Sequence, residues 1–302
     1  MADHPDINDP DRFVYYRYAP SLAAAAIFVT LFGISTSLHT YQLWLKRSWF
    51  LIPFIIGGIF ETVGYIGRIL SSSDQWDKSP YIMQTLLLLI APALFAASIY
   101  MILGRIILLT GGEKYSLIRQ TWLTKIFVSG DVLSFMLQTV GGVLMGMAES
   151  NPNNKEIGEG VIVGGLFVQL FFFGFFIIAS VVFQWRGRDH LAQLPARVTW
   201  MKHLFTLYVV SGLIFVRSLF RVIEYLQGNA GYLLRHEIFL YLFDSVIMLA
   251  VMVSMNIIHP GDIAILLKEK EADSRGFLEM DEMDPQEQKE DHSRRASRRM
   301  FV

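Results

Sequence analysis

Seven long apolar segments occupy most of this 302-residue chain and restrict the folds that it can adopt. An α-helix needs about 20 apolar residues to cross a hydrocarbon core of roughly 30 Å, and each segment is near that length or longer. Inside a bilayer the backbone must satisfy its own hydrogen bonds, and a helix does so within one segment. We therefore predict an all-α bundle of seven transmembrane helices near residues 19–43, 49–70, 81–109, 122–148, 160–183, 203–226 and 237–258.

The composition excludes several classes of protein. With 53% hydrophobic residues and a mean hydropathy of +0.41, the chain is too apolar for an ordinary soluble domain. A net charge of −1 indicates no nucleic-acid partner. The absence of cysteine excludes disulfides, thiol catalysis and cysteine-bound metal centres. No nucleotide-binding motif of the type GxxxxGK(S/T) occurs, so pumping driven by ATP hydrolysis is not expected.

Lys and Arg are concentrated in the loops on one side of the predicted bundle, together with the end of the chain. Because basic loops favour the cytosol, we expect the N-terminus outside and the C-terminus in the cytosol. This orientation gives an extracellular segment over 1–18, a transmembrane domain over 19–260 and a disordered, charged cytosolic tail over 261–302.

The tail contains one candidate regulatory site. The run Arg294-Arg295-Ala296-Ser297 resembles the substrate of a basophilic kinase, so Ser297 is a candidate phosphorylation site. The same basic cluster is also suited to anionic lipid of the inner leaflet. An inert, solvated tail is the third interpretation.

Charged residues within the sixth and seventh segments are the strongest functional signal. A charge at the centre of a membrane helix costs about 2.5–3.5 kcal/mol on insertion scales, so it is tolerated near an interface, in a pair or facing a wet interior. Arg217, Arg221 and Glu224 are spaced i, i+4 and i+7, and Glu237 and Asp244 are also seven residues apart. Each helix therefore carries its charges on one face, and we expect the two faces to meet.

Polar residues of the other segments extend this pattern. Glu61, Tyr65 and Arg68 have the same i, i+4 and i+7 spacing on the second segment. We expect most of the set to line one polar chamber that opens to the outside, with Glu61 near mid-depth and Asp131 towards the cytosol. The candidate substrate-binding residues are Glu61, Tyr65, Arg68, Gln84, Asp131, Gln138, Gln169, Arg217, Arg221, Glu224, Glu237 and Asp244.

Two interpretations of these residues remain open. They are either structural ion pairs and amide hydrogen bonds that hold the helix register, or a binding site. In a binding site, Arg217 or Arg221 suits an acidic or phosphate group, while Glu224, Glu237 or Asp244 suits an amine. Titration of a buried acid on the second, fourth or seventh segment is one way to couple such a site to protons.

Aromatic residues and glycines have structural interpretations. Tyr and Trp at the segment ends, among them Tyr16, Tyr18 and Tyr81, are predicted to anchor the helices in the headgroup region and to bind no ligand. Glycines recur at small-residue spacings on three segments, where we expect them to let helices approach closely. These glycines are Gly57, Gly58, Gly64, Gly67, Gly142, Gly146, Gly160 and Gly164.

Five stretches of the chain resemble one family of fungal membrane proteins. They are ETVGYIGR (61–68), APALFAASIYMILGR (91–105), GDVLSFMLQTVGG (130–142), GGLFVQLFFFGFF (164–176) and RSLFRVIEYLQGNAGYLLRHEIFLYLFDS (217–245). Together they look like the lipid-translocating exporter family, the aminocholesterol-resistance-like proteins, over nearly the whole membrane region. The resemblance implies a seven-helix fungal protein of the plasma membrane or endomembranes. It also implies a role in sphingoid long-chain base release, sterol-analogue and drug resistance, or porphyrin uptake.

The resemblance and the charged helices together favour a transporter of an amphipathic, lipid-like molecule of the sphingoid base, sterol analogue or porphyrin class. Its polar or ionic head would lie in the chamber, and its apolar body in lipid or an apolar cleft. The expected partners are this cargo and the lipid bilayer. We expect no catalytic residue, no cofactor and no metal.

Two other classes of protein are alternatives. The first alternative is a lipid sensor that regulates stress or drug resistance, because receptors also have seven helices and an outer N-terminus. The third segment, however, ends in LGRIILLTGG rather than in the DRY-like triplet of rhodopsin-type receptors, and the seventh ends in VMVSMNIIHP without their NPxxY pattern. The second is an intramembrane metal-dependent lipid hydrolase that would use His39, His203 and His259, with Asp131 at a similar depth, although these histidines lack an HExxH-like spacing.

Overall fold

A computed structural model describes residues 14–147, 153–195, 198–228 and 231–282. These residues form helices joined by turns, with no strand among them. Seven helical spans are long and apolar enough to cross a membrane, which confirms the predicted all-α, seven-helix fold. Ser297, the candidate phosphorylation site, lies outside the described residues.

Single long helices form the first six spans, and shorter helical pieces form the seventh. The first six are α1 (Leu22–Lys46), α2 (Ile52–Ser73), α3 (Lys78–Thr110), α4 (Gln120–Gly146), α5 (Asn153–Ala192) and α6 (Trp200–Leu226). The seventh joins α8 (Glu237–Leu240), the π-helical turn η3 (Tyr241–Ser245) and α9 (Val246–Ile257), and α10 (Gly261–Glu282) follows it. Shorter elements in the connections are η1 (Trp49–Leu51), η2 (Glu113–Tyr115) and α7 (Tyr232–Arg235).

Local chemistry accounts for several helix ends. The Ser21 side chain caps α1 by accepting a hydrogen bond from the Ala24 backbone N–H at 3.4 Å. Asp77 caps α3 in the same way, with the Ser79 backbone N–H as donor at 2.9 Å. Helix α3 ends at Thr110 and is capped by Gly111, whose φ of 63° lies in the left-handed region that glycine adopts without steric strain.

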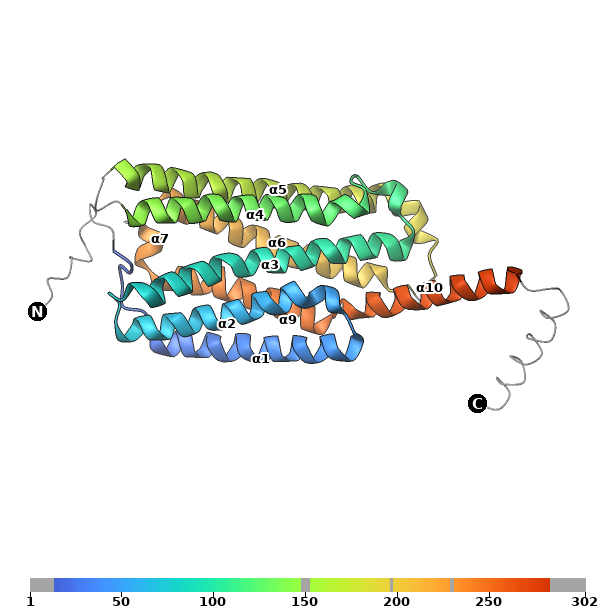
Figure 1. Cartoon of the computed structure of the whole chain (residues 1–302), viewed down its shortest axis with the longest axis horizontal. Coiled ribbons are helices and arrows are strands. Elements are labelled where there is room, and N and C mark those ends of the chain that lie inside the picture. Colours follow the sequence, from blue (N-terminus) through green and yellow to red (C-terminus); the bar gives the residue numbers. More distant parts are fainter. Residues whose placement is uncertain (1–13, 148–152, 196–197, 229–230, 283–302) are drawn as a thin grey trace, which may run out of the picture.

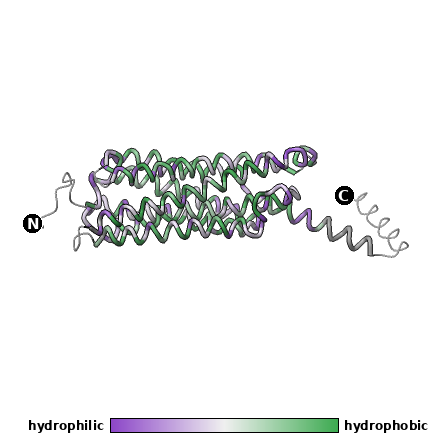
Figure 2. Tube along the Cα trace, turned by 90° about the horizontal axis from the view of Figure 1, so that it is seen from above, coloured by the Kyte–Doolittle hydropathy of each residue, from purple (hydrophilic) through white to green (hydrophobic). Residues whose placement is uncertain are grey.

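The helices run along one axis and form an elongated bundle (Figure 1). Helices α4 and α5 pack along each other, α2 packs against α1 and α3, and α9 packs against α6 and α1. Helix α7 lies at one end and α10 extends from the other, and we call these the α7 end and the α10 end (Figure 1). Figure 2 shows hydrophobic residues along the middle of the bundle and hydrophilic ones gathered towards its ends.

Apolar side chains fill the interior of the bundle and also cover its outer surface. Phe54 and Phe95 are buried between helices, with ring centroids 4.5 Å apart. Large apolar side chains such as Trp44, Phe171 and Ile257 face outward and are exposed. An apolar exterior of this extent is costly in water and suited to the hydrocarbon of a bilayer.

Helix α5 is longer than the segment predicted over 160–183, because it spans Asn153–Ala192. Near the α10 end the extra turns pack against neighbouring elements. His190 Nε2 lies 2.8 Å from the Thr110 carbonyl oxygen, and Leu191 is buried. The outer face of these turns is polar, so hydropathy alone does not detect them.

The tail that was predicted to be disordered from residue 261 begins instead as helix α10, Gly261–Glu282. Its first turns are held against the bundle. Lys46 Nζ pairs with Asp262 Oδ1 at 2.6 Å, and Ile263 is buried. Lys270 Nζ donates hydrogen bonds to carbonyl oxygens at the end of α3. The mean hydropathy of the tail is low, so it does not indicate the short apolar face by which the first turns of α10 pack against the bundle.

Candidate functional site

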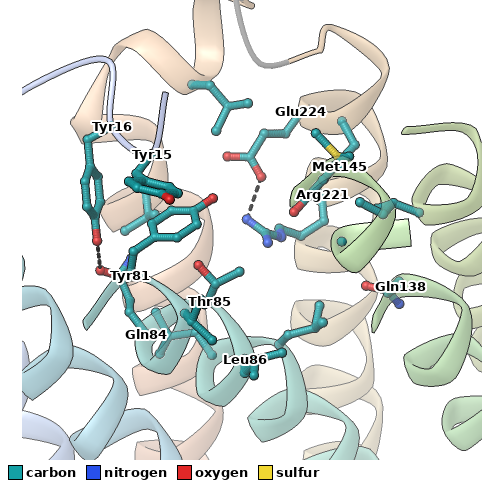
Figure 3. Close-up of a pocket in the computed structure, with 18 of the residues that line it drawn as sticks. Tyr15, Tyr16, Tyr81, Gln84, Thr85, Leu86, Gln138, Met145, Arg221 and Glu224 are labelled. Atoms are coloured by element: carbon teal, nitrogen blue, oxygen red, sulfur yellow. Dashed lines mark hydrogen bonds and ion pairs between the residues drawn. The ribbon is translucent and has the colours of Figure 1, made fainter. Parts of the chain in front are cut away.

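A cavity of about 460 Å³ lies at the α7 end, between residues 14–18, α3, α4, α6 and the seventh span (Figure 3). Much of its wall is aromatic or aliphatic and includes Tyr81, Leu86 and Met145. The charged side chains of Arg221 and Glu224 also face it (Figure 3). A concave site with apolar walls and a few polar groups is typical of small-molecule binding.

The structure brings half of the predicted site residues to this cavity. Its wall includes Arg68, Gln84, Gln138, Arg221, Glu224 and Asp244. Those that are not part of the wall are Glu61, Tyr65, Asp131, Gln169, Arg217 and Glu237. Three residues of this second group, Gln169, Arg217 and Glu237, contact residues of the first, so part of the cavity wall has a polar and charged supporting layer.

Arg221 and Glu224 form an ion pair within one turn of α6, at the cavity surface. Arg221 Nη1 lies 2.6 Å from Glu224 Oε2, and the guanidinium carbon lies 5.3 Å from the centre of the Tyr225 ring. Among the described residues, Arg221 Nε is buried and has no hydrogen-bond partner. The pair therefore presents a cation and an anion to the same cavity.

A second ion pair joins α6 to the π-helical turn η3. Arg217 Nε donates to Asp244 Oδ1, and Arg217 Nη2 donates to the Leu88 carbonyl oxygen at 2.9 Å. Both charged side chains are buried. Asp244 lines the cavity whereas Arg217 lies behind it. Single π turns are common at functional sites, and this one carries the only carboxylate of η3.

The third ion pair links α2 to α8. Arg68 Nη2 lies 2.7 Å from Glu237 Oε1 and donates to the Tyr18 hydroxyl at 2.8 Å. Arg68 Nε donates to the Tyr241 hydroxyl at 3.0 Å. Glu237 Oε1 also accepts a hydrogen bond from the Ser21 backbone N–H at 2.9 Å. The predicted meeting of charged faces from the second, sixth and seventh spans is thus present as defined pairs.

Residues 14–18 form part of the cavity wall, which corrects the interpretation of their tyrosines as headgroup anchors. Tyr16 is buried and donates its hydroxyl to Gln84 Oε1 at 2.8 Å. Burial raises the pKa of Tyr16 and Tyr18 above the usual value for tyrosine, although nearby Arg68 acts in the opposite direction. Both phenols therefore stay protonated at neutral pH.

Tyr81 is a further cavity residue that the sequence pattern placed at the membrane interface. Its ring centre lies 4.9 Å from that of Tyr15 and 5.4 Å from that of Tyr16, so the three rings form one aromatic wall (Figure 3). For the N-terminal tyrosines, the run YYRY (15–18) directly before the first apolar segment is the signal that could have indicated a place in this wall.

Glu61 and Tyr65 lie behind the cavity, where α2 faces the seventh span. The Tyr65 hydroxyl is hydrogen-bonded to Ser245 Oγ of η3. Glu61 is 2% exposed and interacts electrostatically with Asp244 and Arg217. Within the described chain, Glu61 Oε1 has no hydrogen-bond partner.

Asp131 lies apart from this cluster, in contact with α3. Its Oδ2 accepts a hydrogen bond from the Tyr100 hydroxyl at 3.0 Å, beside buried Phe127. Gln138 reaches the cavity and bridges α4 to α5, because its Nε2 lies 3.4 Å from Gln169 Oε1. Gln169 therefore supports a cavity residue, while Asp131 is not part of the wall.

The three histidines considered as metal ligands do gather near the α10 end, on the far side of the bundle from the cavity. The rings of His39 and His259 are 6.0 Å apart. His39 Nε2 is 3.0 Å from the Met252 carbonyl oxygen, and His259 Nδ1 accepts a hydrogen bond from the Gly261 backbone N–H. In the described part of the chain, no three such side chains are arranged to hold a metal ion.

Comparison with known proteins agrees with the resemblance seen in the sequence. The family model described as "RTA1 like protein" matches residues 54–266. Protoporphyrin uptake protein 1 of Saccharomyces cerevisiae is 41% identical over 281 residues, which cover 81% of this chain and 91% of that protein. Protein RTA1 of the same yeast is 37% identical over 261 residues, covering 78% and 81%.

A third relative is the sphingoid long-chain base transporter RSB1 of S. cerevisiae strain Lalvin EC1118, which is 29% identical over 283 residues, covering 82% of this chain and 74% of that protein. No solved structure matches the chain. The family model covers well over half of the sequence, and the structure has the seven apolar spans of a multi-pass membrane protein. The chain therefore belongs to the RTA1-like family.

Proposed function

We propose that this protein moves an amphipathic molecule of the sphingoid base, sterol analogue or porphyrin class across the plasma membrane. The observation that carries the proposal is the cavity at the α7 end, where Arg221 and Glu224 present opposite charges within an otherwise largely apolar wall. The names of two relatives, one for protoporphyrin uptake and one for sphingoid base transport, support this class of cargo. Both names describe movement of a molecule rather than its chemical conversion.

The proposed head-group site consists of the charged and amide side chains that reach the cavity. Arg221 lines the cavity and is placed to receive a carboxylate such as those of a porphyrin. Glu224 and Asp244 are placed to receive an ammonium group such as that of a sphingoid base. Gln84 and Gln138 add neutral hydrogen-bonding groups, so one site can accept either sign of charge.

The apolar part of the cargo is proposed to contact the aromatic and aliphatic wall. Tyr81, Leu86, Val143 and Ile162 supply such a surface around the polar groups. A volume of about 460 Å³ falls within the range of small-molecule sites, roughly 300–1,000 Å³. It is large enough for a head group and the adjoining part of a chain or ring, and the rest of the molecule would extend into lipid.

Transport by purified protein in liposomes tests the proposal. The probes are a fluorescent sphingoid base and protoporphyrin, each followed across the bilayer against protein-free liposomes. Removing one charge should change the preference between them: Arg221→Gln should slow protoporphyrin more, and Glu224→Gln should slow the sphingoid base more, each by about tenfold, which corresponds to roughly 1.4 kcal/mol.

Matched controls lie at the α10 end, away from the cavity. Arg105→Gln removes an arginine that lies 4.0 Å above the Phe50 ring, and Asp262→Asn removes an acid paired with Lys46. Both should leave the preference between the probes unchanged. The transporter proposal fails if the wild-type protein moves neither probe. Binding without movement would favour a lipid sensor instead.

A further inference from the structure

The buried charges around the cavity do not balance in pairs. The three arginines of α2 and α6 pair with Glu237, Asp244 and Glu224. Glu61 is a fourth carboxyl group of the same region, and the ion pairs of the described residues do not include it. A bare carboxylate without a partner in such surroundings is costly, so this side chain needs an explanation.

The surroundings of Glu61 contain one arginine and one competing acid. Arg217 and Asp244 act on it electrostatically, and Tyr65 lies one turn further along α2. Among the described residues of the neighbouring helices, His39 of α1 is bonded to the Met252 carbonyl and Tyr100 of α3 to an acid on α4. Two carboxyl groups thus share Arg217, and only Asp244 holds it in this structure.

Asp244 connects this buried group to the cavity. Its carboxylate is part of the cavity wall and also accepts the hydrogen bond from Arg217 Nε. An ammonium group that enters the cavity would compete with Arg217 for Asp244. Arg217, still held by the Leu88 carbonyl through Nη2, would then have the Glu61 carboxylate as its alternative partner.

We propose that Glu61 is a proton-binding site that exchanges its proton for a cationic head group bound in the cavity. In the empty protein Glu61 is a neutral acid and Arg217 pairs with Asp244. When an ammonium binds Asp244, the Glu61 O–H bond breaks, the proton leaves to water, and the carboxylate pairs with Arg217. One positive charge enters and one leaves, so the buried cluster stays neutral.

This inference rests on the proposed function and names the ion that drives it. Cation and proton compete for one cluster, so the protein would exchange a protonated amine for a proton across the membrane. A proton gradient could then move the amine against its own gradient without ATP. A carboxylate cargo that binds Arg221 alone would not displace Arg217 and would release no proton.

Proton release during binding tests the exchange. Purified protein in weakly buffered detergent is titrated with sphinganine, a long-chain amine, while a pH dye reports protons and calorimetry reports binding. The wild type should release about one proton per amine bound, and its affinity should rise about tenfold per pH unit. Glu61→Gln, which mimics the neutral acid, should still bind but should release no proton and lose the pH dependence.

The matched control is Asp131→Asn. Like Glu61, Asp131 is buried, belongs to no ion pair of the described residues and has one carboxyl oxygen without a hydrogen-bond partner there. This variant should release the same number of protons as the wild type. Proton release that persists in Glu61→Gln, or that disappears in Asp131→Asn, overturns the assignment to Glu61. Amine binding to wild type without proton release overturns the exchange while leaving the transporter proposal intact.

Infrared spectroscopy separates the two proposals even if the amine does not bind. A neutral Glu61 should give the carbonyl band of a protonated carboxylic acid in ligand-free wild type, and Glu61→Gln should lack it. Absence of this band in the wild type overturns the proton site directly. If the band is present but sphinganine neither binds nor changes it, the amine-transport proposal and the exchange fail, while protonation of Glu61 stands.

Discussion

At the residue scale, the three arginines near the cavity, Arg68, Arg217 and Arg221, are tolerated because each has a carboxylate partner. Arg217 contacts both Asp244 and a backbone carbonyl, so its guanidinium is satisfied by two spans besides its own. A buried ion pair adds little to stability compared with apolar residues of the same size, but a buried charge without its partner is strongly destabilising. The Arg217–Asp244 pair can therefore be tested for structure and function separately.

At a pH low enough to keep Glu61 protonated, Asp244→Asn should leave the Arg217 charge buried and unpaired, and should cost about 3–5 kcal/mol of stability. At higher pH the loss should be smaller, because ionised Glu61 can take the place of Asp244 beside Arg217. The expected result is a clear fall in the thermal unfolding midpoint in detergent, followed by tryptophan fluorescence. The double variant Arg217→Met with Asp244→Leu removes both charges and should recover most of that loss. It should nevertheless transport the sphingoid base more slowly, because Asp244, one of the two proposed acceptors for the ammonium group, is gone.

The two outcomes of the double variant distinguish the alternatives that the sequence left open. Recovery of stability together with normal amine transport would show that the pair only holds the helices. Failure to recover stability would contradict the view that the desolvated charges, and not the shape of these side chains, cause the loss in Asp244→Asn.

At the element scale, glycines decide how closely neighbouring helices approach, but not all the predicted ones do so. In α2, a Cβ added at Gly57 would lie 2.7 Å from the Phe95 ring, as expected of a close contact with α3. Nothing among the described residues lies within 4 Å of a Cβ at Gly142, Gly160 or Gly164, so the prediction was wrong for these three. The sequence shows the spacing of the glycines, but it does not show which face of a helix packs against its neighbour, because that depends on how each helix is rotated.

The closest approach of α4 to α5 uses Gly141 instead. A Cβ there would lie 2.6 Å from the Gly158 carbonyl oxygen, which is backbone and cannot move aside easily. Gly141→Ala should therefore destabilise the protein by about 1–3 kcal/mol. The adjacent Gly142→Ala meets no atom of the described residues and should be neutral or stabilising by up to about 1 kcal/mol, because alanine favours a helix.

Thermal unfolding of the two variants in the same detergent checks this contrast, with wild type as reference. Equal effects at the two positions would contradict this rotation of α4 against α5, since the residues are neighbours in sequence and differ mainly in the face that they occupy.

At the scale of the whole molecule, the cavity and the charged cluster lie at one end of the bundle, so function depends on which way the bundle is inserted. The distribution of Lys and Arg predicts that the α7 end faces outward. The chain contains no cysteine, which makes single introduced cysteines unambiguous reporters.

Ser73→Cys places a thiol at the exposed end of α2 near the α7 end, and Arg188→Cys places one on the exposed side of α5 near the α10 end. A maleimide that does not cross membranes should label Ser73→Cys on intact cells. It should label Arg188→Cys only after permeabilisation. The reverse pattern would place the cavity on the cytosolic side, and labelling of wild type measures the background.

The sequence by itself was sufficient for the number of membrane spans, because a run of about 20 apolar residues is a local property that needs no knowledge of the neighbours. It was also sufficient to group Arg217, Arg221 and Glu224 on one face, because helical periodicity depends only on spacing. The family followed from motifs of the same local kind, and the match over residues 54–266 agrees with them.

Only the tertiary structure decided which charge meets which. Arg221 pairs within its own helix whereas Arg217 reaches η3, and no spacing rule distinguishes the two arginines. The folding of Tyr16 and Tyr18 over Arg68, and the separation of Asp131 from the cavity, likewise depend on contacts between segments distant in the chain. Helix rotation and long-range packing determine these contacts, and a local sequence pattern gives no information on either. For the same reason, Glu61 is recognisable as an acid without a partner among the described residues only when all seven spans are in place.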